Sequence, residues 1–431
     1  MDNVSFREAL AVWWRIGLLS FGGPAGQIAL MHRIIVEEKK WLSEARFLHA
    51  LNYCMLLPGP EAQQLATYVG WLLHGVRGGL VAGLLFILPG GLTILIFSWL
   101  YVLLGNLSLV TGLFFGLKAA VLAIVVQALI RIGRRALHGT LKPTLAAVGF
   151  LALFAFGLPF PLVVLSAGII GYFGARWLNP NKTCYEEKIV EHVLVRNGTK
   201  RAAVVCLLLW VLTVISLYLI LGGDNVFTQI STFFSKMAMV TFGGAYAVLS
   251  YVAQQGVENF QWLQPREMLD GLGLAETTPG PLILVTQFVG FLAAYREASL
   301  EPRLLAATLG ALLTTWVTFL PCFFWIFAGA PYVEKFRGNH ALSAALAAIT
   351  AAVVGVIANL AIWFAINAIF EKHFRYKEFG LDLSIPFITS LNLPTLILTC
   401  MAFVMVFVFK IRILPLLAIC SGLGVAWVLL Q

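Results

Sequence analysis

The sequence predicts an all-α polytopic integral membrane protein with two inverted-topology repeats, whose broken or re-entrant helices meet near the bilayer midplane. Composition, an internal repeat and paired glycine–proline breaks predict this fold. Of the 431 residues, 60% are hydrophobic and 11% are charged, whereas soluble domains carry about 25% charged residues. Apolar runs of about 20 residues predict membrane-spanning helices.

The internal repeat is visible in two short motifs. The runs Phe21-Gly22-Gly23-Pro24 and Pro58-Gly59-Pro60 return 221 residues later as Phe242-Gly243-Gly244-Ala245 and Pro279-Gly280-Pro281. Trp41 and Trp262 are separated by the same distance. We therefore expect a first repeat over residues 1–199, a connecting transmembrane helix over 200–225 and a second repeat over 226–431.

Full spans and interrupted segments alternate along the chain. We expect full spans near residues 78–104, 109–131, 141–157, 159–177, 200–222, 302–329, 340–370, 386–409 and 412–430. The motifs interrupt the segments 6–36, 44–76, 226–256 and 265–296. Each half of such a segment is about 15 residues, or about 22 Å of helix, so we expect re-entrant hairpins or sharply kinked helices.

The charges predict the orientation. The loop 131–142 carries four basic residues and no acidic one, which favours the cytoplasmic side. Asp224, the stretch containing Glu258 and Asp270, and the run 371–382 are expected on the other side. An odd number of spans precedes the second repeat, so the two copies should face opposite ways. The net charge of +9 is explained by the inside loops and does not indicate a nucleic-acid partner.

The breaks predict an anion site. A proline after glycine suits the first position of a helix, and four helix N-termini near the midplane would bring unpaired N–H groups and partial positive charge. The candidate positions are Gly22, Gly23, Pro24, Gly59, Pro60, Gly243, Gly244 and Gly280. The alternative is that these residues only permit close packing, but the repetition of both motifs at a fixed distance weighs against it.

Polar side chains follow the breaks at helical spacing. The further candidates for substrate binding are Gln27, Gln63, Gln64, Thr67, Lys118, Thr277, Thr278 and Gln287. Glu61 and Glu276 are candidates for proton coupling, with capping of helix ends as an equal alternative. Lys118 lies in the middle of a predicted span, where it either meets an anionic substrate or pairs with Glu61.

Motifs for other chemistry are missing from the sequence. It contains no GxxxxGK[ST] loop for nucleotide-driven transport, no HExxH pair and no CxxC pair among its six cysteines. We therefore expect no cofactor, no metal site and no catalytic residues. An enzyme acting on lipid phosphate would need a nucleophile, a base and a metal set that the sequence does not display.

Three segments resemble one family. Ser20 to Ala29 (SFGGPAGQIA), Leu57 to Ala66 (LPGPEAQQLA) and Arg131 to Leu137 (RIGRRAL) are similar to the signature of the bacterial chromate transporters, the chromate ion transporter family, in its long two-domain form. The second copy departs from the first at Ala245, at Leu282 in place of Glu61, and at Leu284 and Val285 in place of the glutamine pair. The two repeats are thus expected to contribute unequally.

The resemblance implies a secondary transporter that exports chromate or a related tetrahedral oxyanion across the bacterial cytoplasmic (inner) membrane. Sulfate is implied as a competing analogue, and a homodimer is left open. Outward movement of a dianion against an inside-negative potential is downhill by about 4.6 kcal/mol per 100 mV, and proton exchange could add to this. The alternatives are a transporter of sulfate or other oxyanions, or an anion channel of the same fold.

Overall fold

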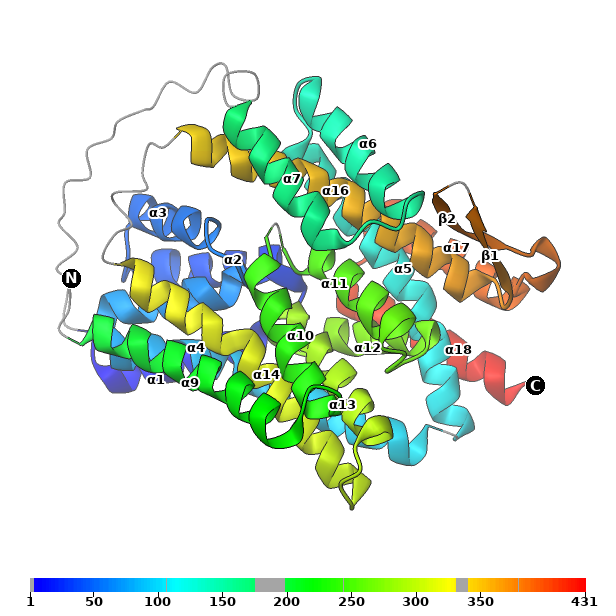
Figure 1. Ribbon diagram of the computed structural model, residues 1–431, viewed down its shortest axis with the longest axis horizontal. Helices are drawn as coiled ribbons and strands as arrows, with labels where there is room; N and C mark the ends of the chain where they lie inside the picture. Colours follow the sequence, from blue (N-terminus) through cyan, green and yellow to red (C-terminus); the bar gives the residue numbers. More distant parts are fainter. Residues whose placement is uncertain (1–3, 106, 175–197, 243, 331–339, 379) are drawn as a thin grey trace. The chain divides into compact units, whose positions relative to one another are not determined.

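The structure is a computed structural model that describes residues 4–105, 107–174, 198–242, 244–330, 340–378 and 380–431. Most of these residues are helical (Figure 1). The chain divides into two compact units, which we describe separately. Unit 1 comprises residues 1–95, 181–245 and 278–339, and unit 2 comprises residues 96–180, 246–277 and 340–431.

Unit 1 contains all four breaks, and it also contains the helices that follow the fourth break. Its elements are α1 (Phe6–Leu19), α2 (Gly23–His32), the π-helix η1 (Arg33–Glu38), α3 (Glu44–Cys54), most of α4 (Glu61–Leu104), α9 (Thr199–Leu221), α10 (Val226–Val240), η3 (Leu282–Leu284), α13 (Val285–Glu297) and α14 (Arg303–Gly329). Within this unit α14 packs between α13, α9 and α10. Figure 1 shows α9 beside α14.

Unit 2 is organised around two long helices, α5 and α16. Its elements are the end of α4, α5 (Ser108–Ala136), α6 (Leu141–Phe154), α7 (Phe160–Phe173), α11 (Ala245–Ala253), the π-helix η2 (Gln254–Asn259), α12 (Pro265–Thr277), α16 (His340–Ile369), β1 (His373–Glu378), β2 (Leu381–Pro386), η5 (Ile388–Ser390), α17 (Leu393–Phe407) and α18 (Ile413–Leu429). Helices α6 and α7 lie along α16 (Figure 1), and α18 lies along α5.

A described helix corresponds to each of the nine predicted spans. Among the residues that the structure describes, five helices are long and apolar enough to cross a membrane: α4, α5, α9, α14 and α16. The other four, α6, α7, α17 and α18, have 14 to 17 residues. Helix α17 begins at Leu393 and not near residue 386, because strand β2 ends at Pro386 and the short 3-10 helix η5 follows it.

The long helix α4 is really two helices. Gly75 has φ 66° and ψ −151°, and His74 is also non-helical. A φ of this sign is open to glycine and disfavoured for other residues. Residues 61–73 therefore complete the second broken segment and 76–104 form the first full span, with the boundary that the sequence predicts.

Local backbone structure is duplicated along with the sequence. The π-helices η1 and η2 begin 221 residues apart, and each is followed by a non-glycine residue with positive φ, Lys40 (52°) and Gln261 (55°). The residues after these two are Trp41 and Trp262. Their backbone N–H groups donate to Ile35 O at 2.9 Å and to Gly256 O at 2.8 Å, respectively. Irregularities that match in type and position indicate that the two copies descend from one module.

Within unit 1 the two copies contact each other reciprocally. The Gly59 N–H donates to Thr241 O at 2.9 Å, and the Gly280 N–H donates to Ser20 O at 2.8 Å. Gly59 matches Gly280 and Ser20 matches Thr241 at the same separation of 221 residues. A contact in which each partner plays both roles is the mark of a two-fold relation.

Several helices present apolar surfaces that are not covered by protein. In α9 only 11% of the most apolar window is buried, and Leu219 and Ile220 are 76% and 78% exposed. Phe173 of α7 is 82% exposed. Large exposed apolar faces of this kind require a nonaqueous surrounding, and the bilayer supplies it.

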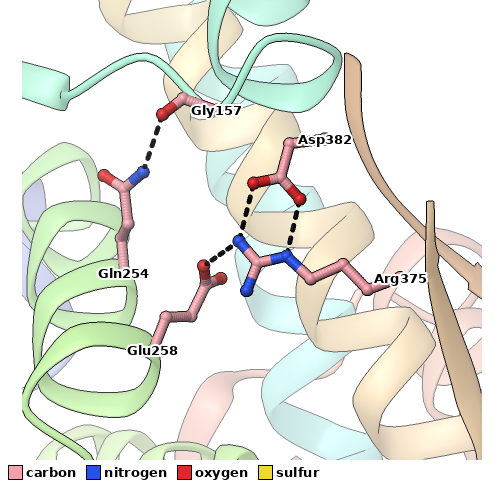
Figure 2. A network of polar contacts seen from close by, with 5 residues as sticks. All are labelled: Gly157, Gln254, Glu258, Arg375 and Asp382. Atoms are coloured by element: carbon pink, nitrogen blue, oxygen red, sulfur yellow. Dashed lines mark hydrogen bonds and ion pairs between the residues drawn. The ribbon is translucent and has the colours of Figure 1, made fainter. Parts of the chain in front are cut away.

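The β-hairpin is an element that the sequence did not lead us to expect. Strands β1 and β2 pair antiparallel, with Arg375 opposite Ser384 and Lys377 opposite Asp382. Figure 2 shows Arg375 at the centre of its contacts. Arg375 donates from Nε and Nη2 to the two carboxylate oxygens of Asp382 at 2.6 and 2.8 Å, and from Nη2 to Glu258 at 3.2 Å.

Two further hydrogen bonds tie this region to the connection between α6 and α7. The Asp382 N–H donates to Ala155 O at 2.8 Å, and Gln254 Nε2 donates to Gly157 O at 3.4 Å (Figure 2). Hydrogen bonds thus link the connection between α6 and α7 to Gln254 and Asp382, and link Arg375 to Glu258. The hairpin is held by polar contacts at the edge of the apolar helices.

Arg375 affects the pKa values of the two acidic residues that it contacts, Asp382 and Glu258. Hydrogen bonding to Arg375 lowers the pKa of Asp382 below its ordinary value. Burial raises the pKa of Glu258, and Arg375 partly opposes that shift. A lowered pKa means that ionised Asp382 stabilises the fold at pH values above its unfolded pKa, and that this contribution is lost as the pH falls through the folded pKa.

We predict that Asp382→Asn loosens the hairpin at neutral pH and removes its acid sensitivity. Amide hydrogen exchange over residues 373–386 should be about two- to five-fold faster than in the unsubstituted protein at pH 7, because an ion pair with one half-exposed partner stabilises only modestly. Once the pH is below the lowered pKa of Asp382 in the folded protein, the two proteins should exchange alike. Glu378→Gln, in the same hairpin but outside the Arg375 cluster, is the control, and equal acceleration in both variants would contradict this role for Asp382.

Candidate functional site

The four breaks in the helices converge on one cavity in unit 1. The cavity is small: the space open to the centre of a water-sized sphere is about 10 Å³, within a wider hollow of about 280 Å³ that includes the open mouth. Residues from each break line it: Pro24 and Gln27 after the first, Pro60, Glu61 and Ala62 after the second, Gly244 and Ala245 at the third, and Pro281, Leu282 and Ile283 after the fourth. The predicted site residues Pro24, Gln27, Pro60, Glu61 and Gly244 are therefore brought together.

Glycine and proline set the geometry of the breaks. Gly22 caps α2 in the left-handed conformation (φ 86°), and Pro24 lies in the first turn. Gly59, Gly244 and Gly280 have φ of 125°, 101° and 96°. The chain thus turns sharply at each break and starts a new helical segment at the cavity. Gly243 lies outside the described residues.

Some backbone N–H groups near the cavity are already hydrogen-bonded, and others have no partner within their own helix. Those of Gly59 and Gly280 are used in the reciprocal bonds to Thr241 and Ser20, so these two are not free for an anion as the sequence analysis assumed. The N–H groups in the first turn of a helix have no partner within the helix. Glu61, Ala62 and Leu282, which line the cavity, occupy such first-turn positions.

The glutamines near the breaks are anchored to the protein. Gln27 Nε2 donates to Gly280 O at 2.6 Å, and Gln64 Nε2 donates to Pro58 O at 2.8 Å. Gln63 Nε2 donates to Thr67 Oγ1 at 3.0 Å, and Gln287 Nε2 donates to Gly91 O at 2.9 Å. Each amide nitrogen retains a second hydrogen.

Gln27 lines the cavity and, like Gln63, Gln64 and Gln287, has a buried amide oxygen without a hydrogen-bond partner among the described residues. It is 1% exposed, and its Oε1 has no hydrogen-bond partner among the described residues. Such an atom costs free energy unless a ligand, a water or a protonated group satisfies it. Gln27 Oε1 is therefore a hydrogen-bond acceptor in the cavity wall that has no donor among the described residues.

Glu61 is the charged residue of the cavity wall. The other lining residues are prolines, small or aliphatic residues and Gln27, and the lining contains no lysine or arginine among the residues that the structure describes. Among the described lining residues, the backbone at the helix starts is therefore the source left for positive potential at this cavity. Glu61 itself is half-buried and begins α4.

Lys118 has a different partner from the one considered in the sequence analysis. In unit 2, Lys118 Nζ on α5 lies 3.3 Å from Asp270 Oδ1 on α12, and their side chains are 20% and 6% exposed. Tyr101 donates its hydroxyl to Asp270 Oδ2 at 3.1 Å. The pair with Glu61 is therefore wrong as a structural account of Lys118.

Asp270 was expected only in a stretch on the non-cytoplasmic side of the membrane, and the structure shows that it is buried. It lies on the face of α12 that packs against α5. The signal in the sequence was its position between Leu269 and Leu272, at helical spacing within an otherwise apolar stretch. Sequence reasoning also missed Tyr101, whose hydroxyl completes this cluster.

Glu276 occupies a second buried polar cluster in unit 2. Tyr246 of α11 donates its hydroxyl to Glu276 Oε1 at 2.6 Å, and Glu276 is 2% exposed. The next residue, Thr277, donates its hydroxyl to Leu274 O at 2.8 Å. Thr278, in unit 1, is buried. Across the described residues, no group of three metal-ligating side chains is found.

The buried pair predicts a specific pattern of stability. Lys118→Met and Asp270→Asn should each destabilise the detergent-purified protein by about 3–5 kcal/mol, because each leaves an uncompensated buried charge. The double variant Lys118→Met with Asp270→Asn should recover most of this stability, as measured by thermal unfolding. The combination of Lys118→Met with Glu61→Gln should not recover it, and rescue by Glu61→Gln would contradict the assignment.

Known proteins are similar to this chain over both of its halves. A family model described as "Chromate transporter" matches residues 7–172 and 228–426. The "Chromate transport protein" of Cupriavidus metallidurans is 28% identical over 85% of this chain and 84% of its own length. That of Pseudomonas aeruginosa is 31% identical over 82% of this chain and 80% of its own length.

A shorter relative matches part of the chain. The "Uncharacterized transporter YwrB" of Bacillus subtilis is 32% identical over 32% of this chain and 71% of its own length. No solved structure matches. The apolar helices and the family matches identify a multi-pass protein of the bacterial inner membrane. The chain belongs to the chromate transporter family.

Proposed function

We propose that this chain is a secondary transporter that exports chromate or a closely related tetrahedral oxyanion, and that the cavity between the four breaks is its substrate site. The observation that carries the proposal is the convergence of the breaks from both repeats on one cavity. The names of the relatives from Cupriavidus metallidurans and Pseudomonas aeruginosa support chromate as the substrate.

The chemistry of the cavity suits an oxyanion. A tetrahedral oxyanion presents four acceptor oxygens, which are complementary to N–H groups at helix starts. Glu61, Ala62 and Leu282 supply such groups, and the cavity wall holds no basic side chain among the described residues. Backbone donors bind an anion without the strong attraction of a lysine, which favours release as well as binding.

Driving force comes from the membrane potential in this proposal. A dianion that leaves a cell with an inside-negative potential moves downhill by about 4.6 kcal/mol per 100 mV. Export therefore needs no nucleotide hydrolysis. An anion channel is the alternative mode, and it differs in showing no saturation at low flux and no counter-exchange.

The experiment that tests the proposal is chromate uptake into everted vesicles, which corresponds to export from the cell. Uptake should saturate, accelerate with an inside-positive potential, and be inhibited by sulfate more than by phosphate. Linear, non-saturating flux would favour the channel. Absence of chromate flux above empty vesicles would contradict the proposal.

A glycine pair provides a matched test of the site. At Gly59 (φ 125°) a Cβ atom would lie 2.8 Å from both Cys322 Sγ and Gln64 Nε2, whereas at Gly139 (φ 79°) nothing lies within 4 Å. Gly59→Ala should lower chromate uptake at least about tenfold, since a misplacement of about 1 Å at a site is costly. Gly139→Ala carries backbone strain without the clash and should retain uptake, with both values normalised to folded protein in the membrane.

We further propose that the two repeats have inverted topology. The reciprocal bonds of Gly59 and Gly280 support a two-fold relation between copies, and the charge distribution favours opposite orientations. Lys40 and Gln261 are equivalent, exposed positions. Single cysteines there should react with a membrane-impermeant maleimide from the cytoplasmic and the external side, respectively. Labelling of both from one side would show parallel repeats.

A further inference from the structure

The cavity holds one feature that an anion site does not require. Glu61 places a carboxylate among helix starts whose partial positive charges would bind the substrate. No hydrogen bond or ion pair holds this carboxylate within the described part of the chain. A negative side chain at the start of a helix is stabilised by the helix itself, so it has the same electrostatic preference as the substrate.

Resting on the proposed function, we propose that the Glu61 carboxylate is a built-in competitor of the oxyanion: when ionised it occupies the positive helix starts, and the oxyanion binds only after Glu61 has taken up a proton. Binding then consumes one proton per oxyanion. The proton goes onto a carboxylate oxygen and no other bond changes. Ionised Glu61 and a dianion in the same cavity would repel each other, which a site without basic side chains cannot offset.

Gln27 supports the state in which Glu61 is protonated and the oxyanion is bound. Its Oε1 is buried and lacks a partner among the described residues, while its Nε2 is fixed by Gly280 O at 2.6 Å. That bond assigns the amide orientation, because the carbonyl of Gly280 can only accept. Gln27 therefore offers an acceptor in the wall that Glu61 also lines, and a protonated carboxyl is a donor.

The stoichiometry follows from the divergence of the two copies. The position equivalent to Glu61 in the second copy is Leu282, which lines the same cavity. The other lining residues do not titrate, and the nearby Cys54 of α3 is a buried thiol. One carboxylate, and hence one proton, therefore accompanies each oxyanion. A dianion that moves with one proton carries half the charge of the dianion alone.

The test is the pH dependence of sulfate binding to the full chain in detergent. Sulfate is the probe because it stays fully ionised over this range, whereas chromate itself takes up a proton. In the unsubstituted protein the dissociation constant should rise about tenfold for each pH unit above the titration of Glu61. In Glu61→Gln it should be independent of pH between about 5 and 8. Glu301→Gln, on an exposed loop, should keep the slope of the unsubstituted protein.

A second measurement does not depend on any variant. Sulfate added to the unsubstituted protein in weak buffer should take up one proton per bound ion. A pH-independent dissociation constant together with no proton uptake, or a full slope retained in Glu61→Gln, would overturn the inference while leaving the oxyanion site intact. If sulfate does not bind, chromate at alkaline pH replaces it, and Glu61→Gln should then bind at least about tenfold tighter. Failure of both ions to bind any form would instead remove the proposed function.

Discussion

The constraint on which this structure depends is the pairing of backbone polar groups where helices break inside an apolar medium. A bilayer supplies no water to an unpaired N–H or C=O group, so interrupted helices persist only where protein or a water-filled cavity satisfies them. Here each break uses the other copy: Gly59 donates to Thr241 O, and Gly280 donates to Ser20 O. The duplication is thus needed to pair these backbone groups, since each hydrogen bond takes its donor from one copy and its acceptor from the other. The donors that remain, at the first turns of the new helices, lie at the cavity.

Charge is handled differently in the two units. Unit 2 buries Lys118 with Asp270 and Tyr101, and it buries Glu276 with Tyr246, so its ionisable groups have partners, as buried charges must. The cavity wall of unit 1 has a single carboxylate and draws its positive potential from backbone dipoles. Dipoles at fixed helix starts bind anions of suitable shape without adding a buried cation, which would itself need compensation in the absence of substrate.

The elements that local sequence controls were predictable, and the pairings that depend on tertiary neighbours were not. Glycine and proline fix backbone angles, so the breaks at Gly22, Gly59 and Gly280 follow from residue type and repetition. The partner of Lys118 depends on how α5 and α12 pack, and spacing along the chain does not contain that information. The hairpin at residues 373–386 was missed because its strands are short and charged, and its stability comes from Arg375, Asp382 and Glu258, which are distant in sequence.

The pattern of divergence between the copies follows from the same physics. Backbone donors need only the correct angles, which explains why Pro60 and Pro281 both enter helical segments at the cavity although the residues after them differ. Side chains are free to diverge once the backbone geometry is kept. Glu61 faces an apolar counterpart in Leu282, and the glutamine pair after Glu61 is replaced by Leu284 and Val285. In the proposed mechanism the symmetric backbone forms the anion site, while the asymmetric side chains determine what accompanies the anion.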